Sequence, residues 1–282
     1  MTFQKFVNYY GKKAVQMGLE KEAIKILVLE LSGMDGATFF ANLNQEIQEE
    51  LESKLTKAVN LYIDEKKPIQ HIIGYSYFYG YKMKVNHQVL IPRPETEELV
   101  SYVLRTYDEV FGEKDVDVVD VGTGSGAIAI ALSKEEPHFH VTATDISKEA
   151  LEVAKENAMQ NQAQVTFLEG DMIEPLIKEK LTFDILVSNP PYIPDNEYVE
   201  DIVKKNEPNL ALFGGLDGMH FYDVILKSAK KVLKEKFIIA FEHSYSKKKE
   251  MMQLANQYFS NASCEVIKDL NGKDRFTIII GR

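Results

Sequence analysis

The stretch Asp120-Val121-Gly122-Thr123-Gly124-Ser125-Gly126 decides the fold of this 282-residue chain. A short run rich in β-branched residues, 116–121, leads into it and predicts a buried strand. The small and apolar run 127–132 follows it and predicts a helix. A strand, a glycine loop and a helix in this order let the backbone approach a nucleotide-like ligand closely. We therefore expect residues 122–126, the glycine loop, to bind such a ligand.

A carboxylate follows the next predicted strand, 140–144. This residue, Asp145, comes 19 residues after Gly126, a position from which a carboxylate can accept hydrogen bonds from both ribose hydroxyls. The glycines follow a Gly-x-Gly-x-Gly pattern rather than the Gly-x-Gly-x-x-Gly fingerprint of dinucleotide-binding folds. The loop and the carboxylate therefore suit NAD and S-adenosylmethionine equally.

The segment Asn189-Pro190-Pro191-Tyr192, the acceptor loop, distinguishes between these cofactors. It follows the apolar run 183–187, so it lies just beyond a predicted strand, where open α/β sheets bind ligands. Its two prolines lack backbone donors and fix φ, which leaves rigid carbonyl acceptors beside the Asn189 amide and the Tyr192 ring. This arrangement suits a planar group that carries an NH2. A hydride-transfer site has no need of it, so the pattern favours S-adenosylmethionine.

The glycine loop, Asp145 and the acceptor loop together resemble the class I S-adenosylmethionine-dependent methyltransferases that act on nitrogen. Further residues narrow this resemblance to the release-factor glutamine methyltransferases of the HemK type. The most specific block is Ile91-Pro92-Arg93-Pro94-Glu95-Thr96-Glu97. The other matching residues are 68–74, Phe78, Gly80, Val85, Val89, Leu90, Glu207, Pro208, Ala211, Leu212, Gly214, Gly215, Asp217, Gly218, Asp269, Leu270, Gly272, Asp274 and Arg275.

The resemblance implies an α/β class I methyltransferase fold, with a mainly parallel seven-stranded sheet whose last strand is antiparallel. A small all-α helical bundle and a β-hairpin linker are expected before it. We assign 1–75 to an N-terminal helical substrate-recognition domain, 76–92 to the hairpin linker and 93–282 to the methyltransferase domain. The periodicity predicts strands at 116–121, 140–144, 164–168, 183–188, 237–241, 263–268 and 275–280, with a turn at Asn271-Gly272.

The region up to about residue 75 has the apolar spacing of packed helices. Three sets of apolar residues each fall on one face of a predicted helix: Phe3, Phe6, Val7, Tyr10 and Ala14, then Ile24, Leu27, Val28 and Leu31, then Ile47, Leu51, Leu55, Ala58 and Tyr62. Alternating aromatic and apolar residues over 75–85 predict the hairpin, and Asn86-His87 predicts a turn. The alternative for its tyrosines is a stacking platform for single-stranded nucleic acid, with Lys82 and Lys84 as the only nearby cations.

By the same resemblance, the chain is an enzyme that transfers a methyl group from S-adenosylmethionine to a glutamine side-chain amide in class I peptide chain release factors. The target glutamine lies in a Gly-Gly-Gln motif. The Asn189 oxygen and the Pro190 carbonyl would accept the two N–H bonds of the amide, and Tyr192 would cover its flat face beside Pro191. The expected cofactor-binding residues are Gly122, Thr123, Gly124, Ser125 and Gly126 at the methionine moiety, Asp145 at the ribose, Asp171 and Met172 at the adenine, and Asn189. The family often has an aromatic residue in place of Met172 and a glycine near Ser244, so this chain departs from the pattern there.

Composition excludes several other classes of protein. The net charge of −10 argues against a broad nucleic-acid footprint, which needs a basic stripe. Cys264 is the one cysteine, so no intrachain disulfide can form. No apolar run has the length of a membrane span and the start lacks a signal-peptide pattern, so we expect a soluble cytoplasmic protein. No further ligand accompanies the pair His138 and His140, so we expect no metal site.

Several alternatives stay open at this point. A methyltransferase acting on an exocyclic amine of a nucleic acid, adenine N6 or guanine N2, would use the same acceptor loop. A second alternative is a non-catalytic scaffold that binds S-adenosylmethionine, although such a scaffold would not need Asn189 and Tyr192. A third is that residues 189–192 form a proline-rich loop without a chemical role. Arg93 and Glu95 belong either to a lid over the active site or to the start of a helix near Pro94.

Overall fold

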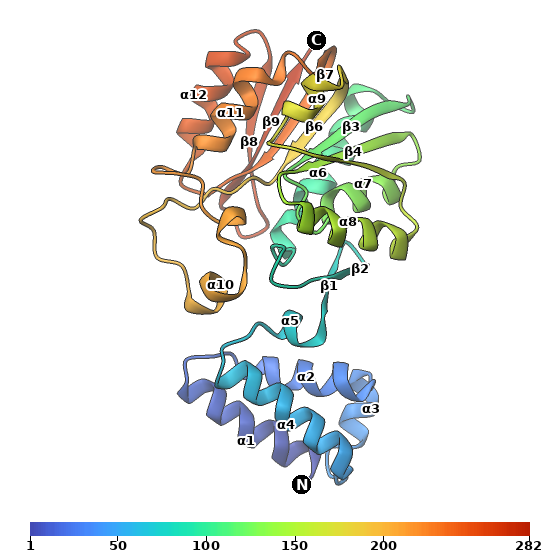
Figure 1. The fold of residues 1–282 in the computed structure, drawn as a ribbon, viewed down its shortest axis with the longest axis vertical. Coiled ribbons are helices and arrows are strands. Elements are labelled where there is room, and N and C mark those ends of the chain that lie inside the picture. The colour runs from blue at the N-terminus through green and yellow to red at the C-terminus, as the bar shows by residue number, and fades with distance from the viewer. The chain divides into compact units, whose positions relative to one another are not determined.

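Two structural units form in the computed structural model, which describes residues 1–282 (Figure 1). The first contains Met1–Tyr75 and Val199–Asn206, and the second contains Ser76–Tyr198 and Glu207–Arg282. The predicted helical region ends at residue 75, and the predicted methyltransferase domain includes residues 199–206, which belong to the first unit. The hairpin is predicted as a separate linker, whereas its residues from Ser76 onward belong to the second unit.

Packed helices form the core of the first unit. The three predicted sets of apolar residues meet in this core, in which Phe6, Leu27 and Leu55 are fully buried. The segment 199–206 joins this unit because Ile202 packs on the same core and Asn206 Nδ2 donates to the Lys66 carbonyl at 2.9 Å. The helices are α1 (Phe3–Gln16), α2 (Glu22–Ser32), α3 (Gly36–Ala41), α4 (Glu49–Ile63), α5 (Ile69–Ile73) and α10 (Asp201–Asn206).

The hairpin consists of β1 (Tyr75–Phe78) and β2 (Tyr81–Lys84). Its turn is Tyr79-Gly80, and both residues have a positive φ, 52° and 81°, as a tight two-residue hairpin turn requires. The predicted turn at Asn86-His87 is also present, because Val89 N–H donates to the Asn86 carbonyl at 3.3 Å, but it follows β2 and does not join the two strands of the hairpin. The hairpin packs on the second unit: Phe78 and Met83 are fully buried in its core, and Tyr81 Oη donates to Glu135 at 2.7 Å.

The second unit contains a seven-stranded sheet of order β5-β4-β3-β6-β7-β9-β8. Neighbouring strands pair in parallel except at β9, which is antiparallel to both β7 and β8. All seven predicted strands are present, and the predicted fold class is confirmed. The strands are β3 (Val116–Val121), β4 (Phe139–Asp145), β5 (Val165–Glu169), β6 (Phe183–Ser188), β7 (Leu233–Glu242), β8 (Ser263–Lys268) and β9 (Asp274–Gly281).

Helices cover both faces of this sheet (Figure 1). Because successive side chains of a strand point to opposite faces, Val118 packs under one helical layer and Val119 under the other. The first layer contains α6 (Pro94–Val110), α7 (Ala127–Glu135) and α8 (Lys148–Asn161), and the second contains α9 (Glu174–Lys178), α11 (His220–Ala229) and α12 (Lys248–Tyr258). None of the helices is both long and apolar enough to cross a lipid bilayer.

Asn157 of α8 connects the hairpin to the glycine loop. It is fully buried, its Oδ1 accepts from the Lys84 backbone N–H at 2.6 Å, and its Nδ2 donates to the carbonyls of Lys84 at 3.1 Å and Ser125 at 2.9 Å. One side chain therefore satisfies backbone groups of two segments that no regular structure pairs.

We predict that Asn157→Ala destabilises the second unit. The substitution removes the partners of backbone groups of Lys84 and Ser125 and opens a small cavity, so the free energy of unfolding should fall by roughly 2–4 kcal/mol. Urea denaturation measures this, with Gln160→Ala on the exposed face of the same helix as the matched control. Equal midpoints for the two variants would contradict this role of Asn157.

Candidate active site

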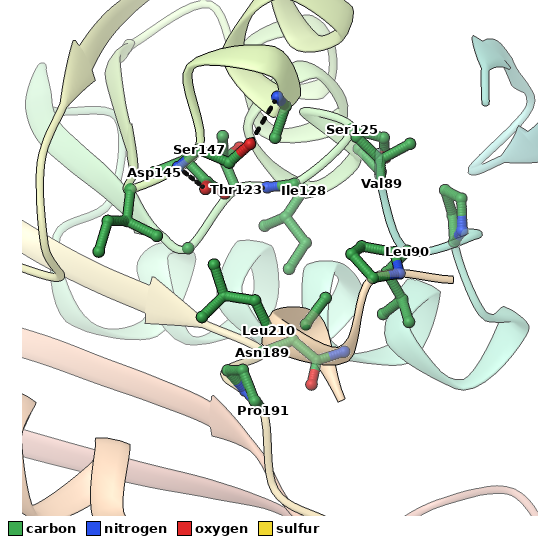
Figure 2. A pocket seen from close by; sticks show the side chains of 18 of the residues that line it. Val89, Leu90, Thr123, Ser125, Ile128, Asp145, Ser147, Asn189, Pro191 and Leu210 are labelled. Carbon is green, nitrogen blue, oxygen red and sulfur yellow. Dashed lines mark hydrogen bonds between the residues drawn. The ribbon is translucent and has the colours of Figure 1, made fainter. Parts of the chain in front are cut away.

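A cavity of about 280 Å³ opens at the carboxyl ends of β3, β4 and β6 (Figure 2). Most of the predicted site residues line it: Gly122, Thr123, Gly124, Ser125, Asp145, Asp171, Met172, Asn189 and Pro191. Three other predicted site residues, Gly126, Pro190 and Tyr192, are not among its lining residues. Residues of the block before α6 also contribute to the wall, including Pro92, Arg93 and Thr96.

The glycine loop forms the floor of this cavity. Gly122, Gly124 and Gly126 all have positive φ, at 74°, 57° and 83°, which only glycine adopts without strain. A Cβ atom on Gly122 or Gly124 would meet no other atom within 4 Å, so the loop leaves open space for a ligand there. Gly126 instead allows α7 and α8 to pack closely, because a Cβ added there would lie 3.1 Å from the Ala154 Cβ and would push the two helices apart.

The Asp145 carboxylate is held by two backbone donors. Its Oδ2 accepts from Gly124 N–H at 2.8 Å, and its Oδ1 accepts from Ser147 N–H at 2.9 Å. Burial raises the pKa of Asp145, and the backbone hydrogen bonds from Ser147 and Gly124 oppose that rise. Each carboxylate oxygen can accept a second hydrogen bond, so the two oxygens remain able to bind ribose hydroxyls.

Asp120, the last but one residue of β3, is fully buried beneath the glycine loop. Its Oδ2 accepts from Thr123 Oγ1 at 2.6 Å, while its Oδ1 has no hydrogen-bond partner. Burial raises the pKa of Asp120 to about 7, against the lowering effect of the Thr123 hydrogen bond. A buried carboxylate oxygen without a donor would favour a ligand that carries positive charge.

The acceptor loop is fixed to the neighbouring elements by side-chain hydrogen bonds. Ser188 Oγ, at the end of β6, donates to the Val121 carbonyl at 2.5 Å. Asn189 Nδ2 donates to Thr96 Oγ1 at 3.1 Å, and Thr96 Oγ1 donates to Glu242 Oε2 at 2.6 Å. Tyr192 Oη lies 3.5 Å from Glu242 Oε1, and burial followed by the Glu242 charge raises the pKa of Tyr192. The Asn189 side chain is thereby held at the wall of the cavity (Figure 2).

Two glycines allow a neighbouring segment to approach the acceptor loop closely. Ile193 N–H donates to the Leu212 carbonyl at 3.0 Å, and Gly214 N–H donates to the Ile193 carbonyl at 2.8 Å. A Cβ on Gly214 would overlap the Pro191 carbonyl and lie 2.9 Å from Tyr192 Cα, and one on Gly218 would overlap the Tyr192 carbonyl. Both positions therefore exclude a side chain.

The block before α6 is fixed by a buried carboxylate, Glu207. Its Oε1 accepts from Arg93 Nη2 at 2.7 Å, and its Oε2 accepts from Ile91 N–H at 2.9 Å. Arg93 is the N-cap residue of α6 and Pro94 is in the first turn, so the helix begins where one of the two interpretations expected. Movement of this block as a lid stays a prediction.

The sequence predicted no role for Thr96, Glu207 or Gly214, although all three are among the residues that resemble the family. Glu242 is not among the predicted site residues either. The available signal was that Glu242 ends a strand, because polar residues at the carboxyl ends of parallel strands gather at the ligand-binding edge of the sheet.

Two of the histidines, His138 and His243, form hydrogen bonds through Nδ1. His138 Nδ1 lies 2.8 Å from Asp115 Oδ1, and this interaction raises the pKa of His138. His243 is fully buried, its Nδ1 bonds to the Ser244 carbonyl at 2.9 Å, and burial lowers its pKa. His243 is therefore neutral near pH 7.

The sheet order, the open glycine loop with its following carboxylate, and an Asn-Pro-Pro-Tyr loop at the same edge define a class I methyltransferase site. A family model described as "Methyltransferase small domain" matches residues 102–217. The release factor glutamine methyltransferase of Bacillus cereus is 42% identical over 260 residues, 92% of this chain and 92% of the relative. That of Bacillus subtilis is 43% identical over 277 residues, 97% of this chain and 96% of the relative. The chain belongs to the release factor glutamine methyltransferase family.

A solved structure supports the fold independently of this family. The crystal structure of a methyltransferase from Pyrococcus furiosus superposes with a TM-score of 0.52 at 19% identity, covering 83% of this chain and 98% of the other. At this level of identity the similarity concerns the fold alone.

We predict that Gly214→Ala lowers the rate of methyl transfer. The added Cβ would displace the acceptor loop, and a displacement of about 1 Å in a positioning group can lower the rate by on the order of 100-fold. Gly36→Ala, where a Cβ meets nothing within 4 Å and φ is not positive, is the matched control. Steady-state kinetics of both variants test this, and an unchanged kcat in Gly214→Ala would contradict it.

We also predict that Asp120→Asn changes the pH dependence of stability. The pKa of Asp120 is about 7 in the folded protein and roughly 4 in an unfolded chain. Protonation of Asp120 therefore stabilises the folded protein, and this stabilisation is lost as pH rises from roughly 4 to 7. Asparagine can still accept from Thr123 but does not titrate. Over that window the wild type should lose stability relative to the variant, by at most about 1.4 kcal/mol per pH unit.

Urea denaturation at a series of pH values measures this difference. Asp195→Asn, at an exposed position, controls for the loss of one negative charge. Parallel stability profiles for the wild type and Asp120→Asn would show that burial does not raise the pKa of Asp120.

Proposed function

We propose that this enzyme methylates the side-chain amide nitrogen of the glutamine in the Gly-Gly-Gln motif of class I peptide chain release factors. The observation that carries the proposal is the position of Asn189, whose oxygen accepts no hydrogen bond from the protein, at the wall of the cavity that the open glycine loop lines. The names of the relatives support the same substrate. Because release factors act on the ribosome, the proposal implies a cytoplasmic enzyme.

We infer that the cofactor is S-adenosylmethionine, which supplies an electrophilic methyl group on a sulfonium. The glycine loop, residues 122–126, would bind its methionine moiety, with the unpartnered Asp120 Oδ1 as a nearby buried acceptor. Asp145 would bind the ribose, and Asp171 and Met172 would contact the adenine. Thr144 Oγ1 donates to the Met172 carbonyl at 2.9 Å and holds that residue at the cavity wall.

The acceptor loop would make the weakly nucleophilic amide nitrogen more reactive. An amide nitrogen has its lone pair delocalised into the carbonyl, the same resonance that keeps peptide bonds planar. Asn189 Oδ1 and the Pro190 carbonyl would accept the two N–H bonds, which orients the nitrogen and raises its electron density. Tyr192 would cover the flat face beside Pro191. No strong general base is required, since the nitrogen loses a proton readily once it carries the new methyl group.

The helical unit is proposed to recognise the release factor. The residues that line the cavity belong to the second unit, and the helical unit has a well-formed core of its own. Its surface exposes large rings, with Tyr9 and Phe40 both 61% exposed, and such side chains are enriched in protein interfaces. The net charge of −10 favours a protein partner over nucleic acid.

The first test is transfer of labelled methyl from S-adenosylmethionine to a purified class I release factor. We expect label in the wild-type factor and none in a factor whose Gly-Gly-Gln glutamine is replaced by alanine. DNA and RNA substrates run alongside. Label in nucleic acid, with none in the factor, would replace this proposal with the exocyclic-amine alternative.

Asn189→Ala separates catalysis from cofactor binding. It removes one of the two proposed acceptors, so kcat should fall on the order of 100-fold while calorimetry finds little change in the affinity for S-adenosylmethionine. The Gly36→Ala protein again serves as control. If cofactor affinity were lost in Asn189→Ala and no wild-type transfer could be detected, the chain would be a binding scaffold rather than this enzyme.

A further inference from the structure

A chain of hydrogen bonds links three separate elements and ends at Asn189. It starts at Glu242, the last residue of β7, passes through Thr96 in the first turn of α6, and reaches Asn189 just after β6. Thr96 Oγ1 donates to Glu242 Oε2 at 2.6 Å, and Asn189 Nδ2 donates to Thr96 Oγ1 at 3.1 Å. Glu242 is 2% exposed and Thr96 is 5% exposed, so water does not compete for these bonds.

The number of protons in this chain fixes the orientation of the Asn189 amide. A threonine hydroxyl has one proton, and an ionised carboxylate can only accept. The 2.6 Å separation between Thr96 and Glu242 is typical of a hydroxyl that donates to a carboxylate. Thr96 then has no proton left and can only accept from Asn189. The amide nitrogen must face Thr96, which leaves Oδ1 free for the cavity.

We propose that Thr96 and Glu242 are positioning residues that hold the Asn189 amide with its oxygen toward the substrate. The inference rests on the proposed function, in which that oxygen accepts an N–H of the substrate amide. A reversed amide would present an NH2 group to the NH2 group of the substrate, and no acceptor would remain on that side. Shape alone cannot prevent the reversal, because the oxygen and the NH2 group of an amide are nearly equal in size.

Protonation of Glu242 would release this constraint. A neutral carboxyl can donate to Thr96, whose own proton is then free to donate to Asn189 Oδ1, and the amide can turn. Burial raises the pKa of Glu242 to about 7, while the Thr96 hydrogen bond and the Arg275 charge lower it and Glu95 raises it. The productive orientation should therefore be lost as pH falls below about 7.

Four other groups near Glu242 do not supply this titration. The pKa of Tyr192 is raised, so its hydroxyl stays neutral, and the buried Tyr222 donates to the backbone carbonyl of Glu242 at 2.7 Å. Arg275 is ionised throughout, and its Nε donates to Asp269 at 3.2 Å. His243 is buried and its pKa is lowered.

The first experiment removes only the Thr96 hydroxyl. In Thr96→Val, kcat for transfer to the release factor should fall about 10- to 100-fold, the cost typical of losing a partner that orients a functional side chain. The KM for S-adenosylmethionine should stay unchanged, and Thr96→Ser should restore kcat. The matched control is Thr106→Val on the same helix, because the buried Thr106 hydroxyl donates only to the Tyr102 carbonyl at 2.7 Å. Equal kcat values for Thr96→Val and Thr106→Val would overturn the proposal.

The second experiment concerns Glu242 and does not depend on activity. The side-chain amide NMR signals of Asn189, assigned by their loss in Asn189→Asp, should shift with a midpoint near pH 7 in the wild type. In Glu242→Gln this shift and the matching acid limb of kcat should both disappear. Asp120 also titrates near 7, but its titration would persist in Glu242→Gln. Asn189 signals that do not respond to pH, or that respond equally in Glu242→Gln, would overturn the proposal.

The two experiments also separate this inference from the proposed function. If the wild type methylates no release factor while the Asn189 signals titrate through Glu242, the hydrogen-bond chain stands and the substrate assignment fails. If the wild type is active and Thr96→Val is equally active, the function stands and the positioning role fails.

Discussion

The site depends first on the parallel pairing of β3 with β6. In that register Val118 lies beside Ile185 and Asp120 beside Val187, so both strands end at the same edge of the sheet. The glycine loop follows one strand and the acceptor loop follows the other, and β4 lies on the opposite side of β3. This is the point at which the order of the strands reverses, where open α/β sheets form their binding crevice. Two loops far apart in the sequence thus become the two halves of one cavity.

Three carboxylates lie near this edge of the sheet in positions where burial makes ionisation unfavourable. Burial raises the pKa of Asp120, Asp145 and Glu242, which means that each ionised group is destabilised by its loss of water. Hydrogen bonds offset this in different degrees: Asp145 has two backbone donors, whereas one oxygen of Asp120 has none. A bound ligand with positive groups would lower the free energy of these ionised states. These carboxylates therefore favour a ligand that carries positive charge.

Local patterns predicted most of the fold and the two loops, because strands, glycine loops and prolines have signatures within a few residues. The alternation of aromatic and apolar residues could not locate the hairpin turn at Tyr79-Gly80. It continues through Tyr79, and the sequence gives no sign that this non-glycine residue has a positive φ. It also could not assign residues 199–206 to the helical unit, because only tertiary contacts join Asn206 to Lys66. Thr96 and Glu242 are 146 residues apart. They come into contact because of the order of the strands in the sheet, and this order cannot be read from a short segment of sequence.

The site therefore combines two kinds of control over one amide. Gly214 and Gly218 control where the acceptor loop lies, because close backbone contact excludes any side chain at those positions. Position alone, however, does not determine which end of the Asn189 amide faces the substrate. The proton that Thr96 gives to Glu242 makes that choice, and it does so only while the carboxylate is ionised. A backbone carbonyl such as that of Pro190 needs no such support, because the chain itself fixes its direction. This difference explains why a side-chain acceptor at this site requires two buried polar residues behind it.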